Sequence, residues 1–196
     1  MDVIPIIHLK HQILFKKKET ASVRALLDKH SLSSVYLYDE QGILKNHPQV
    51  DFYQKLSKVY ELWVDAGPRE VGDIVDIVFS GAKKIVLRPS SWVETDVKTI
   101  RDLTDHQLFC HYDIDVTQRE ENMRYPLPDY DFDGIIVFVH GDWKKRRFAT
   151  EEKIKNLAKK NHAFVYTSDY QDQSFWKSVG FKGILVDIDH FPEVIS

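Results

Sequence analysis

The chain of 196 residues is poor in cysteine and glycine, and it has no long hydrophobic run. Cys110 is the only cysteine, so no disulfide can form within the chain, and we expect a reducing, cytoplasmic location. No apolar stretch is long enough to cross a bilayer. The first residues, MDVIPIIHLKH, also lack the basic and apolar regions of a signal peptide. We therefore expect no membrane association and no secretion.

A strong positive charge is missing as well. The net charge is −3, whereas a nucleic-acid-binding protein normally presents a basic face. The two basic runs, Lys16-Lys17-Lys18 and Lys144–Arg147, are short and favour solvated loops over phosphate contacts. The remaining composition, 43% hydrophobic and 29% charged, is typical of a soluble globular protein. The length fits one domain over residues 1–196, and we expect no nucleic-acid partner and a monomer or homodimer.

The stretch Glu61–Ser91 has the pattern of a strand, a turn, a helix and a second strand. Leu62-Trp63-Val64 is a short apolar run ended by Gly67-Pro68. Gly81 has the character of a helix stop, and Ile85–Leu87 forms the next apolar run. One apolar helical stripe lies between the two runs, formed by Val71, Ile74, Val75 and Val78. Two buried strands joined by one helix predict a parallel βαβ unit.

The same alternation continues along the whole chain. Expected strands begin near residues 3, 34, 61, 84, 107, 134, 162 and 183, a spacing of about 26 residues, which is short for a barrel unit. Ser80–Leu87 and Val179–Val186 resemble each other half a chain apart, as duplication of a four-unit half would produce. We predict a compact (βα)₈ TIM barrel with short or degenerate helices after strands five and eight. An open doubly wound sheet is the alternative.

Local patterns place the other helices and one extension. We expect a hairpin-like extension at His11–Phe15 and a capping box at Ser91-Trp92-Val93-Glu94. Thr150 is the predicted N-cap of the helix that precedes strand seven. The remaining predicted helices cover Thr20–His30, His47–Val59, a segment with Val97, Ile100 and Leu103 facing inward, and Ser174–Val179.

Three segments resemble the HisA/HisF family, the ribotide isomerase of histidine biosynthesis and its cyclase relative, which are ribulose-phosphate-binding barrels. Met1–Leu14 (MDVIPIIHLKHQIL) is similar to the family's first strand, and Val64–Leu87 (VDAGPREVGDIVDIVFSGAKKIVL) is similar to its third unit. Leu108–Val116 falls where the family has its fifth strand. The chain looks most like a divergent branch of the family that is associated with tetrahydromethanopterin-dependent one-carbon metabolism.

The resemblance implies a pair of catalytic residues. In the isomerase, aspartates at the ends of strands one and five act as base and acid. The first matches His8 here, and the second matches Asp113, or Asp115 if the register differs by two. A histidine–aspartate pair across a barrel mouth can perform acid–base catalysis of an isomerase or lyase type, without a cofactor. The alternative for His8 is a simple hydrogen bond in the mouth.

The turns that hold phosphate in that family have lost most of their glycines here, and Gly67 is the one that remains in them. The chain has eight glycines, well below the usual share of about 7%. Carboxylates in these turns repel an anion, at a cost of about 3 kcal/mol per pair at ~5 Å and an effective dielectric constant of ~20. The turns read Asp65-Ala66-Gly67, Arg88-Pro89-Ser90, Thr167-Ser168-Asp169 and Asp187-Ile188-Asp189. We therefore predict a substrate that is not bisphosphorylated, and keep the ribotide isomerase and a non-catalytic metabolite- or protein-binding barrel as alternatives.

Polar residues recur at the predicted carboxyl ends of the strands, the face at which TIM barrels carry their chemistry. Besides the two catalytic candidates, the predicted residues for a small-molecule ligand are Asp39, Asp65, Arg69, Arg88, Asp142, Asp169 and Asp187. They favour a cationic or amine-bearing ligand, a divalent metal, or carboxyls with raised pKa values that act as acids. No metal-binding motif is present, so we predict no metal, although His111 and His140 each precede an aspartate by two residues. Arg69 and Arg88 are expected to pair with these acids or to hold one anionic group.

Overall fold

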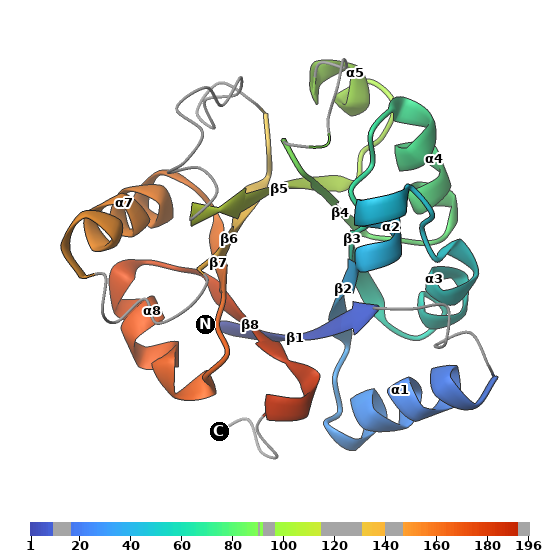
Figure 1. Ribbon diagram of the computed structural model, residues 1–196, viewed down its shortest axis with the longest axis horizontal. Coiled ribbons are helices and arrows are strands. Elements are labelled where there is room, and N and C mark those ends of the chain that lie inside the picture. Colours follow the sequence, from blue (N-terminus) through green and yellow to red (C-terminus); the bar gives the residue numbers. More distant parts are fainter. Residues whose placement is uncertain (10–16, 90, 92–96, 115–130, 140–146, 192–196) are drawn as a thin grey trace.

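A computed structural model describes residues 1–9, 17–89, 91, 97–114, 131–139 and 147–191. Eight parallel strands pair in chain order and close between the last and the first into a barrel (Figure 1). The strands are β1 (Asp2–Leu9), β2 (Ser34–Asp39), β3 (Glu61–Asp65), β4 (Lys84–Leu87), β5 (Gln107–Asp113), β6 (Gly134–Phe138), β7 (Ala163–Tyr166) and β8 (Gly183–Asp187). The predicted (βα)₈ barrel is confirmed.

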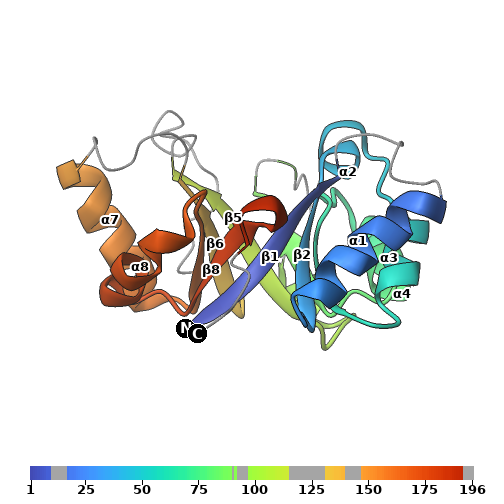
Figure 2. The same cartoon turned by 90° about the horizontal axis from the view of Figure 1, so that it is seen from below.

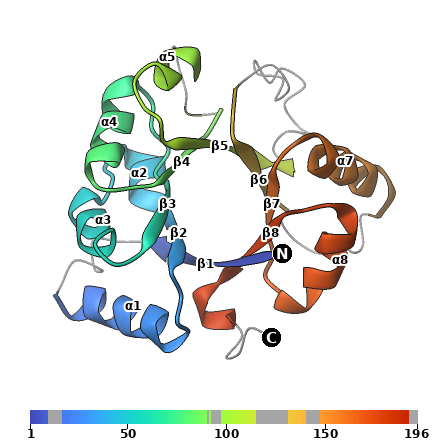
Figure 3. The same ribbon diagram turned by 180° about the vertical axis from the view of Figure 1, so that it is seen from behind.

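The helices surround the ring of strands, as views from both ends of the barrel show (Figures 1 and 3). In the side view, α2 lies at the end of the barrel where β1 finishes (Figure 2). None of the described helices combines the length and apolar character needed to cross a bilayer. The helices are α1 (Lys17–Lys29), α2 (Glu40–Lys45), α3 (Val50–Leu56), α4 (Val71–Phe79), α5 (Val97–Arg101), α7 (Arg147–Lys160) and α8 (Gln173–Val179), with the short 3₁₀ turns η4 (Tyr170–Asp172) and η5 (Ile188–His190).

Alternation along the strands divides the core into an interior and an outer layer. Along β2, Val35 and Leu37 belong to the outer core, which the helices cover, whereas Tyr36 belongs to the barrel interior. Trp63 packs inside the barrel, where the centroid of its ring lies 4.9 Å from the ring centroids of both Phe109 and Phe164. The interior cluster consists of Ile4, Ile6, Tyr36, Trp63, Val86, Phe109, Ile136, Phe138, Phe164 and Leu185. The middle of the barrel is therefore filled by apolar side chains.

The stretch Glu61–Ser91 folds largely as predicted. Gly81 follows α4 with a φ of +91°, which confirms it as the helix stop. The buried face of α4 is formed by Ile74 and Ile77, however, while Val75 is only partly buried. The stripe is thus rotated slightly from the predicted one, because a short helix needs only two side chains to contact the barrel.

Some local predictions were wrong. The helix before β7 starts at Arg147, one turn before the predicted N-cap Thr150. Leu103, expected to face inward, is 57% exposed because α5 ends at Arg101. The short helix α2 was not predicted. After β8, the described residues form only the 3₁₀ turn η5, in agreement with the short or degenerate helix predicted there. The hairpin at His11–Phe15, residues 92–94 of the capping box and residues 115–130 after β5 lie outside the described residues.

Candidate functional site

His8 and Asp187 form a hydrogen bond where β1 and β8 adjoin at the carboxyl end of the barrel. Nε2 of His8 lies 2.9 Å from Oδ1 of Asp187, and both side chains are about one-quarter exposed. Tyr166, from β7, donates its hydroxyl to the other carboxylate oxygen at 2.7 Å. Alternation brings these three side chains into the barrel, since each follows an interior residue by two positions. The arrangement is a solvent-accessible histidine held by a carboxylate.

The protonation state of Asp187 follows from its partners. Burial would raise the pKa of Asp187, but the hydrogen bonds from His8 and Tyr166 outweigh burial, and the pKa is lowered. Burial and the hydrogen bond to Asp187 raise the pKa of the Tyr166 phenol. Asp187 is therefore ionised and Tyr166 protonated around neutral pH. An ionised carboxylate at Nε2 favours the tautomer whose Nε2 carries the proton, which leaves Nδ1 of His8 as an acceptor.

Deeper in the barrel, a buried ion pair joins β3 to β4. Nε and Nη2 of Arg88 each donate to one carboxylate oxygen of Asp65 at 2.7 Å. The hydroxyl of Tyr36 donates to the same carboxylate, also at 2.7 Å. Burial alone would raise the pKa of Asp65, but the charge of Arg88 and the proximity of His111 hold it well below its usual range. Asp65 is fully buried, so its charge is neutralised inside the protein rather than offered to a ligand.

His111 lies beside this ion pair on β5. Its Nδ1 lies 3.2 Å from Asp65 but makes no aligned hydrogen bond. Burial and the charge of Arg88 lower the pKa of His111, so this imidazole is neutral around neutral pH. Its ring stacks on Phe138 with centroids 4.5 Å apart, and Phe138 stacks in turn on Tyr166 at 5.0 Å.

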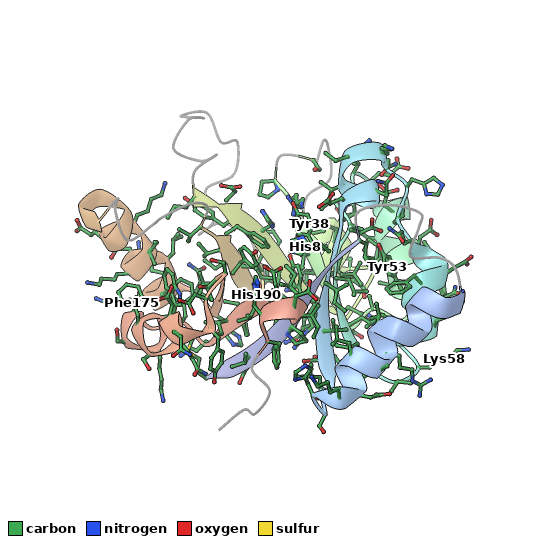
Figure 4. All side chains as sticks on the ribbon, turned by 60° about the horizontal axis from the view of Figure 1, so that its bottom comes forward. His8, Tyr38, Tyr53, Lys58, Phe175 and His190 are labelled. Atoms are coloured by element: carbon green, nitrogen blue, oxygen red, sulfur yellow. The ribbon has the colours of Figure 1, made fainter. Side chains whose placement is uncertain are left out.

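Tyr38 connects the two groups. Tyr38 lies beside His8 (Figure 4), with ring centroids 5.1 Å apart. Its ring centroid also lies 4.9 Å from the guanidinium carbon of Arg88. Burial raises the pKa of Tyr38, although the charge of Arg88 acts in the opposite direction. The polar end of the barrel is thus two-layered. A buried Arg88–Asp65 pair lies beneath a ring-lined surface that carries the exposed His8–Asp187 pair.

The structure separates Asp39 from the other predicted site residues. Asp39 faces the outer layer and is fully buried. Its carboxylate accepts hydrogen bonds from the backbone N–H groups of Gln41, Gly42 and Gln49, at 3.0, 3.1 and 2.8 Å, and from the hydroxyl of Tyr53. Tyr53 lies outside the barrel wall, on α3 (Figure 4). This placement gives Asp39 a structural role as the N-cap of α2, and no ligand reaches it.

The other predicted residues are scattered over the barrel end. Asp113 is partly buried and ends β5, on the strand face that also carries His111. Arg69 donates to the backbone carbonyl of Ile43 at 3.3 Å, and no ion pair joins it to a described acid. Asp169 caps η4 at the rim above β7. Asp115 and Asp142 lie outside the described residues.

Two of the predicted acids, Asp65 and Asp187, are already paired with other side chains. Asp65 is paired with Arg88, as predicted for one of the two arginines, and His8 contacts Asp187 rather than Asp113. The pKa values of Asp65 and Asp187 are lowered, which contradicts the idea of carboxyls with raised pKa values at these two positions. Within the described ranges, no three His, Cys, Asp or Glu side chains are arranged to hold a metal ion.

Sequence reasoning missed the tyrosines of the site. Tyr38 and Tyr166 occupy strand positions whose side chains enter the barrel, but the apolar pattern marks both only as members of strand runs. Their signal was the period of two: each lies two residues after an interior aromatic residue, Tyr36 or Phe164. Assigning alternate residues of each strand to the barrel interior would have identified both tyrosines.

No protein-family model matches the chain, and no curated protein is significantly similar to it. Solved structures do resemble it. The 3-hexulose-6-phosphate synthase of Salmonella typhimurium is 13% identical with a TM-score of 0.64, over 95% of this chain and 89% of that one. A dihydrodipicolinate synthase of Agrobacterium tumefaciens is 12% identical (TM-score 0.59, 96% and 70% covered), and an N-acetylneuraminate lyase of Mycoplasma synoviae is 9% identical (0.57, 97% and 70%). The likeness is one of fold. These neighbours are TIM barrels of families other than HisA and HisF.

Proposed function

We propose that this chain is a small-molecule enzyme that performs acid–base catalysis at the carboxyl end of its barrel. The observation that carries the proposal is the His8–Asp187 pair, a part-exposed imidazole whose Nε2 lies 2.9 Å from an ionised carboxylate. The barrel neighbours support the class, since their names describe synthases and a lyase of small molecules. Histidine titrates near neutrality, which suits a group that both accepts and returns a proton.

Each residue of the pair has a separate role. Nδ1 of His8 takes a proton from the substrate, while Asp187 orients the ring and stabilises the imidazolium that results. Tyr166 keeps the carboxylate in place through its 2.7 Å hydrogen bond. Asp113 is the proposed second acid–base group, because β5 lies opposite β1 in the closed ring. Two such groups on opposite sides of a substrate suit an isomerase- or lyase-type reaction.

The proposed substrate is not bisphosphorylated. Arg88, which could have held a phosphate, is already paired with Asp65 through two hydrogen bonds. A carboxylate, Asp169, occupies the turn after β7. Both observations disfavour the ribotide isomerase of histidine biosynthesis. The resemblance of Val64–Leu87 to the HisA family supports a relationship to that family, and through its divergent branch to tetrahydromethanopterin-linked one-carbon metabolism.

Deuterium exchange tests the proposal whatever the product of the reaction is. The intact protein is incubated in D₂O with a panel of aldoses, ketoses, their monophosphates and 2-oxo acids, and NMR follows loss of carbon-bound protons. The wild type is expected to exchange at least one compound. His8→Gln should slow that exchange by about 10²–10⁴-fold, and Asp187→Asn by a smaller factor.

A histidine away from the site is the matched control. His106 precedes β5 at the opposite end of the barrel and bonds to Thr104 at 2.7 Å, so His106→Gln should keep the wild-type rate. Equal exchange by the wild type and His8→Gln would remove His8 from the catalytic role. Thermal stabilisation by a panel compound without any exchange would favour the non-catalytic binding barrel.

A further inference from the structure

A cavity of about 370 Å³ opens at the rim of the barrel, between the segment that follows β7 and the turn that follows β8. It is lined by Ser168, Asp169, Tyr170, Gln171 and His190. The last of these, His190, ends η5, three residues after Asp187 (Figure 4). A cavity of this volume lies within the range of small-molecule sites.

The lining carries unused hydrogen-bonding groups. One carboxylate oxygen of Asp169 accepts from the backbone N–H of Gln171 at 2.9 Å, while the other, Oδ2, has no partner in the described part of the chain. The same holds for the hydroxyls of Ser168 and Tyr170, the amide of Gln171 and the imidazole of His190: none bonds to a described residue. The residues that line the cavity therefore bring both donors and acceptors that are not used within the described part of the chain.

The turn is unsuited to a phosphate. Its backbone N–H groups are partly used within the chain, since Asp169 donates to Thr167 Oγ1 at 3.3 Å and Asp172 donates to the carbonyl of Asp169 at 3.1 Å. Among the described residues, neither lysine nor arginine lines the cavity, and no glycine occurs between residues 167 and 173. The Asp169 carboxylate would also repel an anion. A metal ion is disfavoured too, because Asp169 is the one carboxylate that the described residues contribute to the lining.

We propose that this cavity binds a neutral polyhydroxylated group, the chemistry of a sugar or a polyol. Oδ2 of Asp169 can accept from two neighbouring hydroxyls, as carboxylates have about four acceptor positions. The Gln171 amide and the Ser168 and Tyr170 hydroxyls both donate and accept, which matches hydroxyl groups better than it matches a group of one polarity. The Tyr170 ring, which packs against the outer core, offers an apolar face to the C–H side of such a ligand. The inference does not depend on the catalytic role of His8.

Ligand titration of the intact protein tests the site. Glucose, sorbitol, glucose 6-phosphate and orthophosphate are compared by isothermal titration calorimetry and saturation-transfer NMR. Glucose or sorbitol is expected to bind saturably, glucose 6-phosphate more weakly, and orthophosphate not at all. Asp169→Ala should weaken the binding of the neutral compounds by about tenfold, the loss of one hydrogen bond to a charged group.

Two further variants distinguish a loss of ligand contacts from a loss of the structure of the turn. Asp169 also caps η4, so Tyr170→Phe, which removes only a hydroxyl, should weaken binding by about threefold to tenfold with no change in thermal stability. His106→Gln, at the opposite end of the barrel, should bind the neutral compounds like the wild type. The proposal is overturned if neither neutral compound binds saturably, if Tyr170→Phe and Asp169→Ala bind like the wild type, or if orthophosphate binds more tightly than glucose.

Discussion

At the scale of single residues, Asp39 shows how a buried carboxyl group is held by hydrogen bonds. It is fully buried, and among the described residues no lysine or arginine forms an ion pair with it. Instead, three backbone N–H groups and the Tyr53 hydroxyl donate to its side chain. Hydrogen bonds inside the protein replace those to water, so this cluster can offset the loss of hydration. Asp39 thereby connects the end of β2 to both α2 and α3.

Removing that carboxylate should cost much of the protein's stability. Asp39→Ala leaves several buried donors without a partner, and we expect the free energy of unfolding to fall by about 3–5 kcal/mol. Urea unfolding followed by circular dichroism measures the change. Asp51→Ala, at an exposed acid in the first turn of α3, should change stability by about 0.5 kcal/mol. If both substitutions lower the free energy of unfolding by a similar amount, the hydrogen bonds around Asp39 contribute no more to stability than an exposed acid does.

Strand parity also explains which site residues the sequence could identify. His8 and Asp187 were predicted to lie at the carboxyl end, and they do, because both follow long apolar runs whose ends are clear. Asp39 was placed at the same end, yet its side chain faces outward. A one-residue difference in where a strand ends moves a side chain to the opposite face, so the sequence could not distinguish Asp39 from Tyr38.

At the scale of elements, α4 depends on the glycine that ends it. Gly81 has a φ of +91°, and a Cβ atom there would lie 2.7 Å from Cβ of Ser57 and closer still to its hydroxyl. Gly81→Ala therefore combines left-handed backbone strain with a steric clash, and should destabilise the protein by roughly 2 kcal/mol in urea unfolding.

Another glycine on the same helix is the matched control. Gly72 lies in the first turn of α4, where a Cβ atom would meet only the Glu70 carboxylate at 3.7 Å. Gly72→Ala should stabilise the protein by about 0.5–1 kcal/mol, because alanine loses less backbone freedom in a helix. Destabilisation by both substitutions would indicate that α4 tolerates no change of this kind, and that the strain at Gly81 is not specific.

The elements themselves were predictable to different degrees. β7 starts at Ala163, one residue from the predicted start near 162, because charged and polar residues flank a short apolar run. The six-residue helix α2 was missed because it is too short to show an apolar period, and the capping geometry of Asp39 forms it instead. The first turn of α7 precedes the expected cap at Thr150, since a threonine can also lie within a helix. Periodicity thus identifies long elements better than their ends.

At the scale of the whole molecule, closure of the barrel is weakest between β3 and β4. These strands share only two residue pairs in register, Trp63 with Lys84 and Val64 with Ile85, whereas the β2–β3 pairing has five. The Arg88–Asp65 ion pair spans the same two strands just beyond their last backbone pairing. A buried ion pair therefore connects the two strands beyond the point where their backbone hydrogen bonds end. The comparison with solved barrels reports the fold but could not have revealed this bridge.

Breaking this bridge should destabilise the closed barrel. Arg88→Met leaves the buried Asp65 charge uncompensated, and we expect the free energy of unfolding to fall by about 3–5 kcal/mol at pH 7. Adding Asp65→Asn removes that charge, while the amide oxygen can still accept from Tyr36. The double variant should therefore be more stable than Arg88→Met alone. If the second substitution brings no recovery, the loss in Arg88→Met comes from packing rather than from an uncompensated charge.

The same bridge predicts how the whole molecule responds to acid. The pKa of Asp65 is lower in the folded than in the unfolded state, so the unfolded chain binds the proton first as the pH falls. The stability that Asp65 contributes is then fully present above about pH 4, the ordinary pKa of an aspartate, and declines as the pH falls toward the folded-state pKa. Urea unfolding at pH 7, 5, 4 and 3 should show a steeper loss for the wild type than for the double variant. Every other carboxyl titrates in both proteins, so parallel curves would mean that the Arg88–Asp65 pair does not keep Asp65 ionised.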